Sequence, residues 1–179
     1  MIRLETKRLI LRNWSLADAS DLFDYAKLDT VGPKAGWKPH EAINESIEII
    51  KRFIAADDVW AVEHKEDNKV IGSVGMHRKD NETDRLTREL GYVLSTKYEN
   101  QGLMTEACQA VLAHTFNDTD IDTVVVSHFQ GNHKSQRVIE KCGFIFVEEG
   151  EYVTIDKRRI WSLYYKLTKN QYILNGGKQ

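Results

Sequence analysis

The chain has 179 residues, of which 41% are hydrophobic and 29% are charged, and its formal net charge is −2. This length predicts a single domain over residues 1–179 with an ample core, and the composition is that of a soluble globular protein. A net charge near zero argues against a direct nucleic-acid partner, and the lack of a long apolar run or secretory leader predicts a cytoplasmic protein with no membrane partner.

The first 56 residues predict one strand and two helices. A strand is expected at residues 8–14, and Ser15 then opens a helix because Asp18 completes a capping-box pattern. Residues 31–40 hold both prolines of the chain and predict an ordered loop. The apolar face is expected to be Leu16, Ala19, Leu22, Phe23 and Ala26 in the first helix, and Ile43, Ile47, Ile50 and Ile54 in the second.

The middle of the chain predicts a hairpin, a third strand and a helix. Residues 59–64 and 69–76 flank the polar turn KEDN, and Trp60 and Val62 share one strand face. Residues 77–85 form a charged segment that predicts a loop, and a strand is expected at 87–96. The helix that follows is expected at 105–116, with one face formed by Ala107, Ala110, Val111 and His114.

The C-terminal part continues with a β-branched strand at residues 123–129, a helix at 132–142 and strands at 144–147 and 159–167. The last residues, NGGKQ, predict a frayed tail. Hairpin-connected strands mixed with strands that are separated by helices favour a mixed sheet in an α/β or α+β domain.

Cys108 and Cys142 each fall within a predicted helix on or near its apolar stripe. Buried free thiols are favoured over a disulfide or a nucleophile, because neither cysteine lies beside a histidine in a loop and cytosolic chains keep thiols reduced. The chain has no CxxC, HExxH or comparable ligand spacing, so we expect no metal.

The most informative feature is the junction of the strand ELGYVLST with the segment YENQGLMTEA, where Gly102 precedes a helical pattern. Several backbone N–H groups converge at such a junction, and the positive end of the helix dipole adds to them, so it suits a phosphate or diphosphate. The alternative is that Gly102 merely turns the chain. A second polar helix start follows at Asn132 and Ser135 in NHKSQRVIEKCGF.

Three stretches, ETKRLILRNWSLADASDLFDY, ELGYVLSTKYENQGLMTEA and NHKSQRVIEKCGF, resemble in order and spacing the GNAT acetyltransferases. The resemblance is to the RimJ/RimL-like branch, which includes ribosomal-protein N-terminal acetyltransferases. It implies a six- or seven-stranded mixed sheet that splays between its fourth and fifth strands, here residues 87–96 and 123–129. Acetyl-CoA, the co-substrate, would lie in that cleft, and homodimers are common in this branch.

The diphosphate-binding pattern of the family, Q/R-x-x-G-x-G/A, falls on residues 99–104, where only Gly102 matches outright. Glu99 places an acid where a basic or neutral residue is usual, and Met104 replaces a small residue. These departures do not abolish the site if Glu99 turns to solvent, because main-chain N–H groups supply most of the binding. The residues expected to bind acetyl-CoA are Leu94, Asn100, Gln101, Gly102, Leu103, Met104, Thr105, Asn132 and Ser135.

The resemblance also implies roles at the second helix start. Asn132 matches an asparagine that binds the pantetheine arm, and Ser135 a serine that helps the thiolate to leave. Helix capping is the alternative for both, and a cap and a ligand contact are compatible. Many other members carry a tyrosine as general acid four residues further along, where this chain has Ile139, so Ser135 is the candidate that is left.

Acetyl transfer requires a neutral amine, and an α-amino group with a pKa near 7.8 is about one-seventh neutral at pH 7. Deprotonating a lysine at pH 7 costs about 4.6 kcal/mol, whereas an α-amino group needs much less help. A modest base acting through water would therefore suffice for a protein N-terminus. Glu89 is the first candidate, because it matches an acidic position of the family and shares a strand face with Gly91 and Val93. An exposed or ion-paired Glu89 is the alternative.

Other residues are candidates for binding the amine. Trp37 and His40 lie in the loop that borders the acceptor pocket in the family, although Trp37 could pack on a helix and His40 could cap one. His128, at a strand end, is a further candidate base. Tyr165 matches a recurrent tyrosine of the last strand and is expected on the acceptor side, with core packing as the alternative. The remaining histidines are expected to be structural or exposed: His64, His77, His114 and His133.

The leading function is therefore acetyl-CoA-dependent N-acetylation of a primary amine, such as the N-terminal amine of a ribosomal or other protein. A small-molecule acceptor is the second hypothesis, namely a polyamine, an amino acid or an antibiotic. An acidic acceptor pocket would favour such polycations. The third hypothesis is a non-catalytic acyl-CoA-binding module, which turnover with any amine would exclude.

Overall fold

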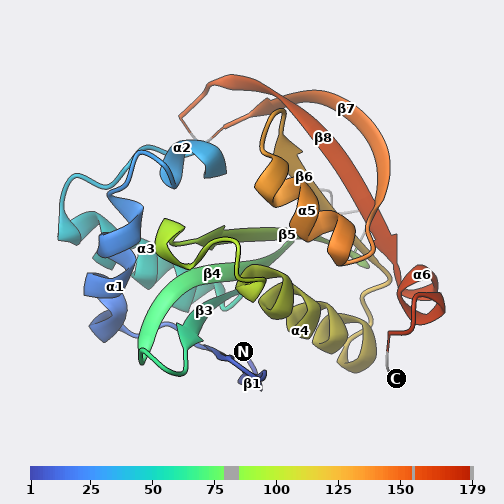
Figure 1. The fold of residues 1–179 in the computed structure, drawn as a ribbon, viewed down its shortest axis with the longest axis horizontal. Coiled ribbons are helices and arrows are strands. Elements are labelled where there is room, and N and C mark those ends of the chain that lie inside the picture. Colours follow the sequence, from blue (N-terminus) through green and yellow to red (C-terminus); the bar gives the residue numbers. More distant parts are fainter. Residues whose placement is uncertain (79–84, 155, 178–179) are drawn as a thin grey trace.

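The computed structural model describes residues 1–78, 85–154 and 156–177 and is built around one mixed sheet (Figure 1). The sheet has eight strands in the order β1-β2-β3-β4-β5-β6-β8-β7, and only β5 and β6 are parallel neighbours. The expected mixed sheet is thus confirmed. It has more strands than the six or seven expected, partly because the two-residue β1 extends one edge.

The strands are β1 (Leu4–Glu5), β2 (Leu9–Arg12), β3 (Val59–His64), β4 (Lys69–Arg78), β5 (Thr87–Leu94), β6 (Thr123–Phe129), β7 (Ile145–Val153) and β8 (Arg159–Thr168). The helices are α1 (Ala19–Ala26), α2 (Gly32–Ala35), α3 (Ile43–Ala56), α4 (Leu103–Asp118), α5 (His133–Lys141) and α6 (Lys169–Leu174). Single 3₁₀ turns precede α1 and α4, at Leu16–Asp18 (η1) and Thr96–Tyr98 (η2).

Helices cover both faces of the sheet. Alternate strand residues point to opposite sides, and both sides carry apolar residues that must be buried. Trp60 and Val62 of β3 share one face, as predicted, and pack into the core beneath α4, whereas Val59 and Ala61 pack beneath α1 and α3. Both cysteines are free thiols, with Cys108 in the α4 core. No helix within the described ranges is long and apolar enough to cross a membrane.

Two short helices stand where sequence patterns predicted none. Residues 31–40 are not entirely loop, because α2 forms with Pro33 in its first turn and ends at Gly36, which has a φ of 87°. The C-terminal segment begins with α6, where Thr168 and Gln171 complete a capping box. Neither helix is long enough to show the 3.6-residue periodicity by which longer helices are recognised.

Several predicted boundaries and apolar faces also change. The strand β4 extends through Arg78, two residues into the predicted charged loop, whose residues 79–84 lie outside the described ranges. The strand β7 runs well beyond its predicted end at residue 147. Leu16 is 52% exposed, and Tyr25 takes a buried place on α1 instead. Ile43 and Ile54, at the two ends of α3, are also exposed, whereas Ile50 is fully buried.

The strands β5 and β6 diverge soon after they meet (Figure 1). Their parallel ladder has three registered pairs, Thr87 with Thr123, Arg88 with Val124 and Glu89 with Val125. The rest of β6 pairs only with β8 among the described strands. The sheet therefore splays between the two strands that were expected to separate, and the opening begins next to Glu89.

Candidate active site

A cleft of about 840 Å³ opens at this divergence, a volume within the range of small-molecule sites. Both sides of the sheet contribute to it, since Tyr92 packs toward α4 and the neighbouring Val93 toward α1 and α3. The predicted site residues that line it are Trp37, His40, Glu89, Leu94, Asn100, Gly102, Leu103, Met104, Thr105, His128, Asn132 and Ser135. Gln101 and Tyr165 are not part of the lining.

The start of α4 has the geometry of an anion site. Asn100 and Gly102 both have positive φ angles, of 62° and 76°, so the chain turns sharply into the helix. The helix N-cap residue, Gly102, has no side chain to bond the first N–H groups of the helix. The first turn of α4 lines the cleft, and these donors have no side-chain cap within the described part of the chain, an arrangement that fits a diphosphate.

An ion pair beneath this loop holds it in place. Arg8 Nη1 donates to the carbonyl oxygen of Gln101 at 2.8 Å, and Arg8 Nε donates to Glu106 Oε2 at 2.8 Å. Thr6 Oγ1 donates to Glu106 Oε1 at 2.6 Å. The loop position of Gln101 is thus fixed through its backbone, while its side chain reaches Lys97 outside the cleft. The sequence analysis did not predict these contacts, although two of the quoted motifs contain the residues that make them.

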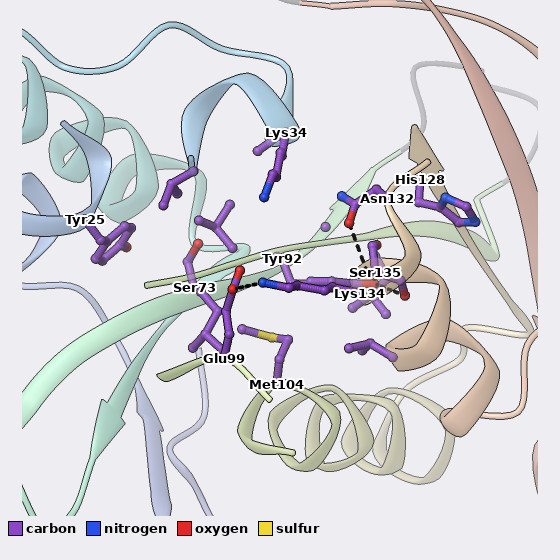
Figure 2. A pocket seen from close by; sticks show the side chains of 18 of the residues that line it. Tyr25, Lys34, Ser73, Tyr92, Glu99, Met104, His128, Asn132, Lys134 and Ser135 are labelled. Carbon is purple, nitrogen blue, oxygen red and sulfur yellow. Dashed lines mark hydrogen bonds and ion pairs between the residues drawn. The ribbon is translucent and has the colours of Figure 1, made fainter. Parts of the chain in front are cut away.

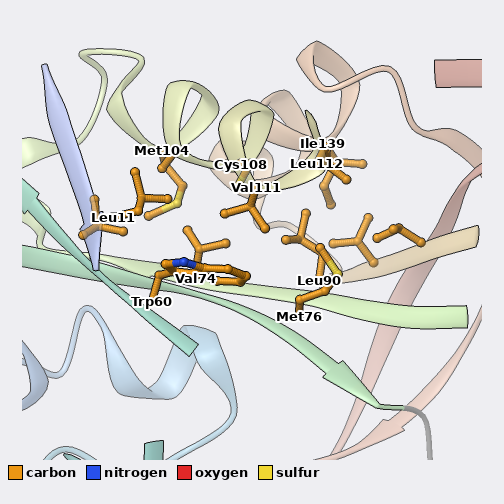
Figure 3. Close-up of a cluster of buried hydrophobic side chains, with 14 of the residues drawn as sticks. Leu11, Trp60, Val74, Met76, Leu90, Met104, Cys108, Val111, Leu112 and Ile139 are labelled. Atoms are coloured by element: carbon orange, nitrogen blue, oxygen red, sulfur yellow. The ribbon is translucent and has the colours of Figure 1, made fainter. Parts of the chain in front are cut away.

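Glu99 does not turn to solvent. Its carboxylate pairs across the cleft with Lys134 Nζ of α5, and its side chain is only 20% exposed (Figure 2). The negative charge at this unusual position is therefore balanced by a lysine that also lines the cleft. Met104, the other departure from the family pattern, is 4% exposed and packs into the core with Leu11 and Cys108 (Figure 3).

We expect Glu99→Gln to tighten CoA binding about two- to fivefold, because it frees Lys134 to meet the phosphates without a competing carboxylate. Calorimetry with CoA at low and high salt measures the change, which salt should reduce. Lys134→Met is the matched control and should weaken binding. Equal affinities of Glu99→Gln and the parent protein would show that the ion pair does not compete with the ligand.

The start of α5 brings Asn132 and Ser135 together in the cleft wall. Asn132 is the N-cap residue, and its Oδ1 accepts the backbone N–H of Ser135 at 3.2 Å. The capping role is therefore real for Asn132. Ser135 Oγ lies 2.7 Å from the hydroxyl of Tyr92 on β5. Ile139, where other family members carry a tyrosine, is 1% exposed and part of the core (Figure 3).

Both ring nitrogens of His128 are used within the protein. Its Nδ1 lies 3.0 Å from the carbonyl oxygen of Phe129, which can only accept, so Nδ1 carries the hydrogen. The Nε2 atom then accepts from the hydroxyl of Tyr165 at 3.1 Å. Tyr165 is 5% exposed and packs on His128 and Phe146, in keeping with the core alternative. Among the candidate bases, His128 is therefore the least available.

Glu89 lines the cleft where β5 and β6 diverge, and its carboxylate takes part in none of the side-chain hydrogen bonds or ion pairs found among the described residues. Burial first, and then the charge of Glu89, raise the pKa of Tyr152 and of Tyr164. His40 also lines the cleft, with its Nδ1 2.8 Å from Ser46 Oγ and its ring against Trp37. Partial burial lowers the pKa of His40, so its ring is neutral at pH 7.

His77 is a cleft residue that sequence reasoning assigned to the structural or exposed group. It pairs with Glu89 in the β4–β5 register, and its Nδ1 lies 3.0 Å from Asp58 Oδ2. A carboxylate only accepts, so Nδ1–H donates, and in the neutral ring Nε2 then carries the lone pair. A Cβ added at Gly75 would lie 2.4 Å from this Nε2, so the glycine makes room for the ring. The pattern G-x-H in a strand was the available signal.

Comparisons with known proteins agree with this geometry. The chain matches the family model described as acetyltransferase (GNAT) domain over residues 8–145. It is 28% identical over 146 residues to a Bacillus subtilis (strain 168) protein named uncharacterized N-acetyltransferase YoaA. That match covers 79% of this chain and 81% of the relative.

Solved structures share the fold at low identity. An acetyltransferase (GNAT family) from Bacillus anthracis has a TM-score of 0.83 at 22% identity, covering 94% of this chain and 99% of that one. The ribosomal-protein-S5-alanine acetyltransferase from Vibrio fischeri has a TM-score of 0.73 at 17% identity, covering 95% and 98%. The microcin C7 self immunity acetyltransferase MccE, in complex with acetyl-CoA and AMP, has a TM-score of 0.79 at 17% identity, covering 91% and 93%.

Proposed function

The chain belongs to the GNAT family of N-acetyltransferases, and we propose that it transfers the acetyl group of acetyl-CoA to the α-amino group at the N-terminus of a peptide or protein. Acetyl-CoA supplies a thioester that an amine can attack. The uncapped start of α4 would hold its diphosphate, and Asn132 would hold its pantetheine arm. Glu89 would accept the proton of the amine, directly or through water.

The charge of the cleft lining is the observation that carries the choice of acceptor. Its cationic residues are Lys34, Lys38, Arg52, Lys134, Arg137 and Lys141, whereas its carboxylates are Glu89 and Glu99. Glu99 is already paired with Lys134. Polyamines and aminoglycosides carry several positive charges and need acidic pockets, so this lining disfavours them. A protein N-terminus brings one ammonium group, whose charge is lost before attack.

The candidate general bases of the cleft are weak, which supports the same class of acceptor. An α-amino group is partly neutral at pH 7, so one carboxylate beside water suffices, whereas deprotonating a lysine costs about 3.5 kcal/mol more. The ribosomal-protein-S5-alanine acetyltransferase shares this fold and acts on a protein, according to its name. That likeness is one of fold, and the charge of the cleft is the stronger support.

A screen of CoA release tests the proposal. We expect turnover with peptides that have a free N-terminus, and little with spermidine, free amino acids or an aminoglycoside. The matched control is the same peptide with an acetylated N-terminus and one internal lysine, which should be inactive. Faster turnover of a polyamine or an aminoglycoside would contradict the proposed acceptor. Acetyl-CoA binding without turnover of any amine would support the non-catalytic module instead.

A further inference from the structure

Tyr92 and Ser135 face each other across the wall of the cleft, on β5 and at the start of α5 (Figure 2). The hydroxyl of Tyr92 lies 2.7 Å from Ser135 Oγ and 3.1 Å from the Ser135 carbonyl oxygen. It is therefore held by two atoms of one residue. This contact joins β5 to α5 just beyond the point where the β5–β6 ladder ends.

The hydrogens of this pair can be arranged in two ways. When Tyr92 donates to the Ser135 carbonyl, Ser135 can donate back to Tyr92 and the pair is closed. When Tyr92 donates to Ser135 Oγ, the hydrogen of Ser135 turns away from Tyr92 and is free for an acceptor in the cleft. Burial raises the pKa of Tyr92 well above its ordinary value, with Cys108 adding to the effect. Tyr92 therefore keeps its hydrogen and remains a donor.

We propose that Tyr92 is a positioning residue for the departure of CoA: its hydroxyl turns the Ser135 hydrogen toward the sulfur of the thioester. The inference rests on the acetyl transfer proposed above. The amine nitrogen bonds to the acetyl carbon, the C–S bond breaks, and its electron pair stays on sulfur. Ser135 donates a hydrogen bond to this developing thiolate without giving up its proton, and the proton of the amine goes to the base.

Many other family members carry a tyrosine as general acid where this chain has Ile139. The Tyr92–Ser135 pair would take over the role of that tyrosine. Because the side chain of Ile139 is buried in the core, it presents no polar atom to the sulfur. A hydroxyl oriented by a second, permanently protonated hydroxyl stabilises negative charge with little reorganisation during the reaction. A tyrosine from β5 thus acts through the serine of α5.

Kinetics of single and double variants test the coupling. We expect Tyr92→Phe and Ser135→Ala each to lower kcat about tenfold, with the KM for acetyl-CoA changed less than about twofold. The double variant should lose little more than either single one, because both remove the same hydrogen bond. Ser135→Thr should retain most of the rate. The matched control is Tyr164→Phe, whose hydroxyl donates to the Glu151 carbonyl outside the cleft.

A second measurement does not depend on the acceptor amine. Ultraviolet absorption of the thiolate gives the pKa of the CoA thiol in the binary complex, which the pair should lower. Tyr92→Phe and Ser135→Ala should each raise it again, while CoA affinity at low pH holds. Absence of turnover with a lowered thiol pKa would refute the proposed function alone. Multiplying losses in the double variant, a pure KM effect, or a thiol pKa that Tyr92→Phe leaves unchanged would overturn the inference.

Discussion

Replacing Gly102 by valine is expected to weaken acetyl-CoA binding at least tenfold, or about 1.4 kcal/mol. Gly102 has a φ of 76°, which a β-branched residue adopts only with strain, so the loop would shift and its N–H groups would lose their common direction. The protein itself leaves room, since a Cβ there would meet only Arg8 Nη2, at 3.7 Å. The loss would therefore come from backbone conformation and from a side chain in the anion site.

Calorimetry with acetyl-CoA measures this loss, and thermal unfolding shows whether the variant folds. Gly176→Val is the matched control, because Gly176 has a φ of 85°, open surroundings and a place near the C-terminus. It should show similar backbone strain with unchanged affinity. Gly102→Asn tolerates positive φ better and should lie between the two. Unchanged affinity in a folded Gly102→Val protein would remove the diphosphate from this loop.

Sequence periodicity located the longer elements because their patterns are local. The β-branched run at residues 123–129 gave β6 its observed bounds, and the predicted helix at 132–142 differs from α5 only by its two cap residues. Short helices lack such a pattern. The helix α6 could still have been found, since Thr168 and Gln171 have the spacing of a capping box.

Contacts between residues far apart in the sequence explain which parts of the candidate site could not be predicted. The splay could be expected from the family, but the side chains that meet around it could not. Arg8 reaches Glu106 from 98 residues away, and Tyr92 reaches Ser135 from 43 residues away. Such pairs depend on sheet register and on the placement of α4 and α5, which packing decides. The family resemblance therefore pointed to Glu89 and Ser135 as candidates, but not to the residues beside them, His77 and Tyr92.

The second large effect is expected at Glu89. If its carboxylate takes the proton of the amine, Glu89→Gln should lower kcat about 100-fold near pH 7 and leave CoA affinity unchanged. The glutamine keeps the size of the side chain but cannot serve as a base. The loss should shrink as pH rises above the pKa of the amine, because free amine then forms without help. A pH–rate series with the peptide from the acceptor screen measures both features.

Two histidines of the same cleft make the result decisive. His40→Ala should cost less at every pH, because partial burial already lowers the pKa of that ring and makes it a weaker base. His77 is the stronger rival, since Asp58 fixes its Nδ1–H and its Nε2 has no hydrogen-bond partner among the described residues. If His77→Asn gives the pH-dependent loss while Glu89→Gln gives a uniform one or none, the base is His77. Asp58→Asn should then reproduce the His77→Asn profile, because the carboxylate would act only through the imidazole.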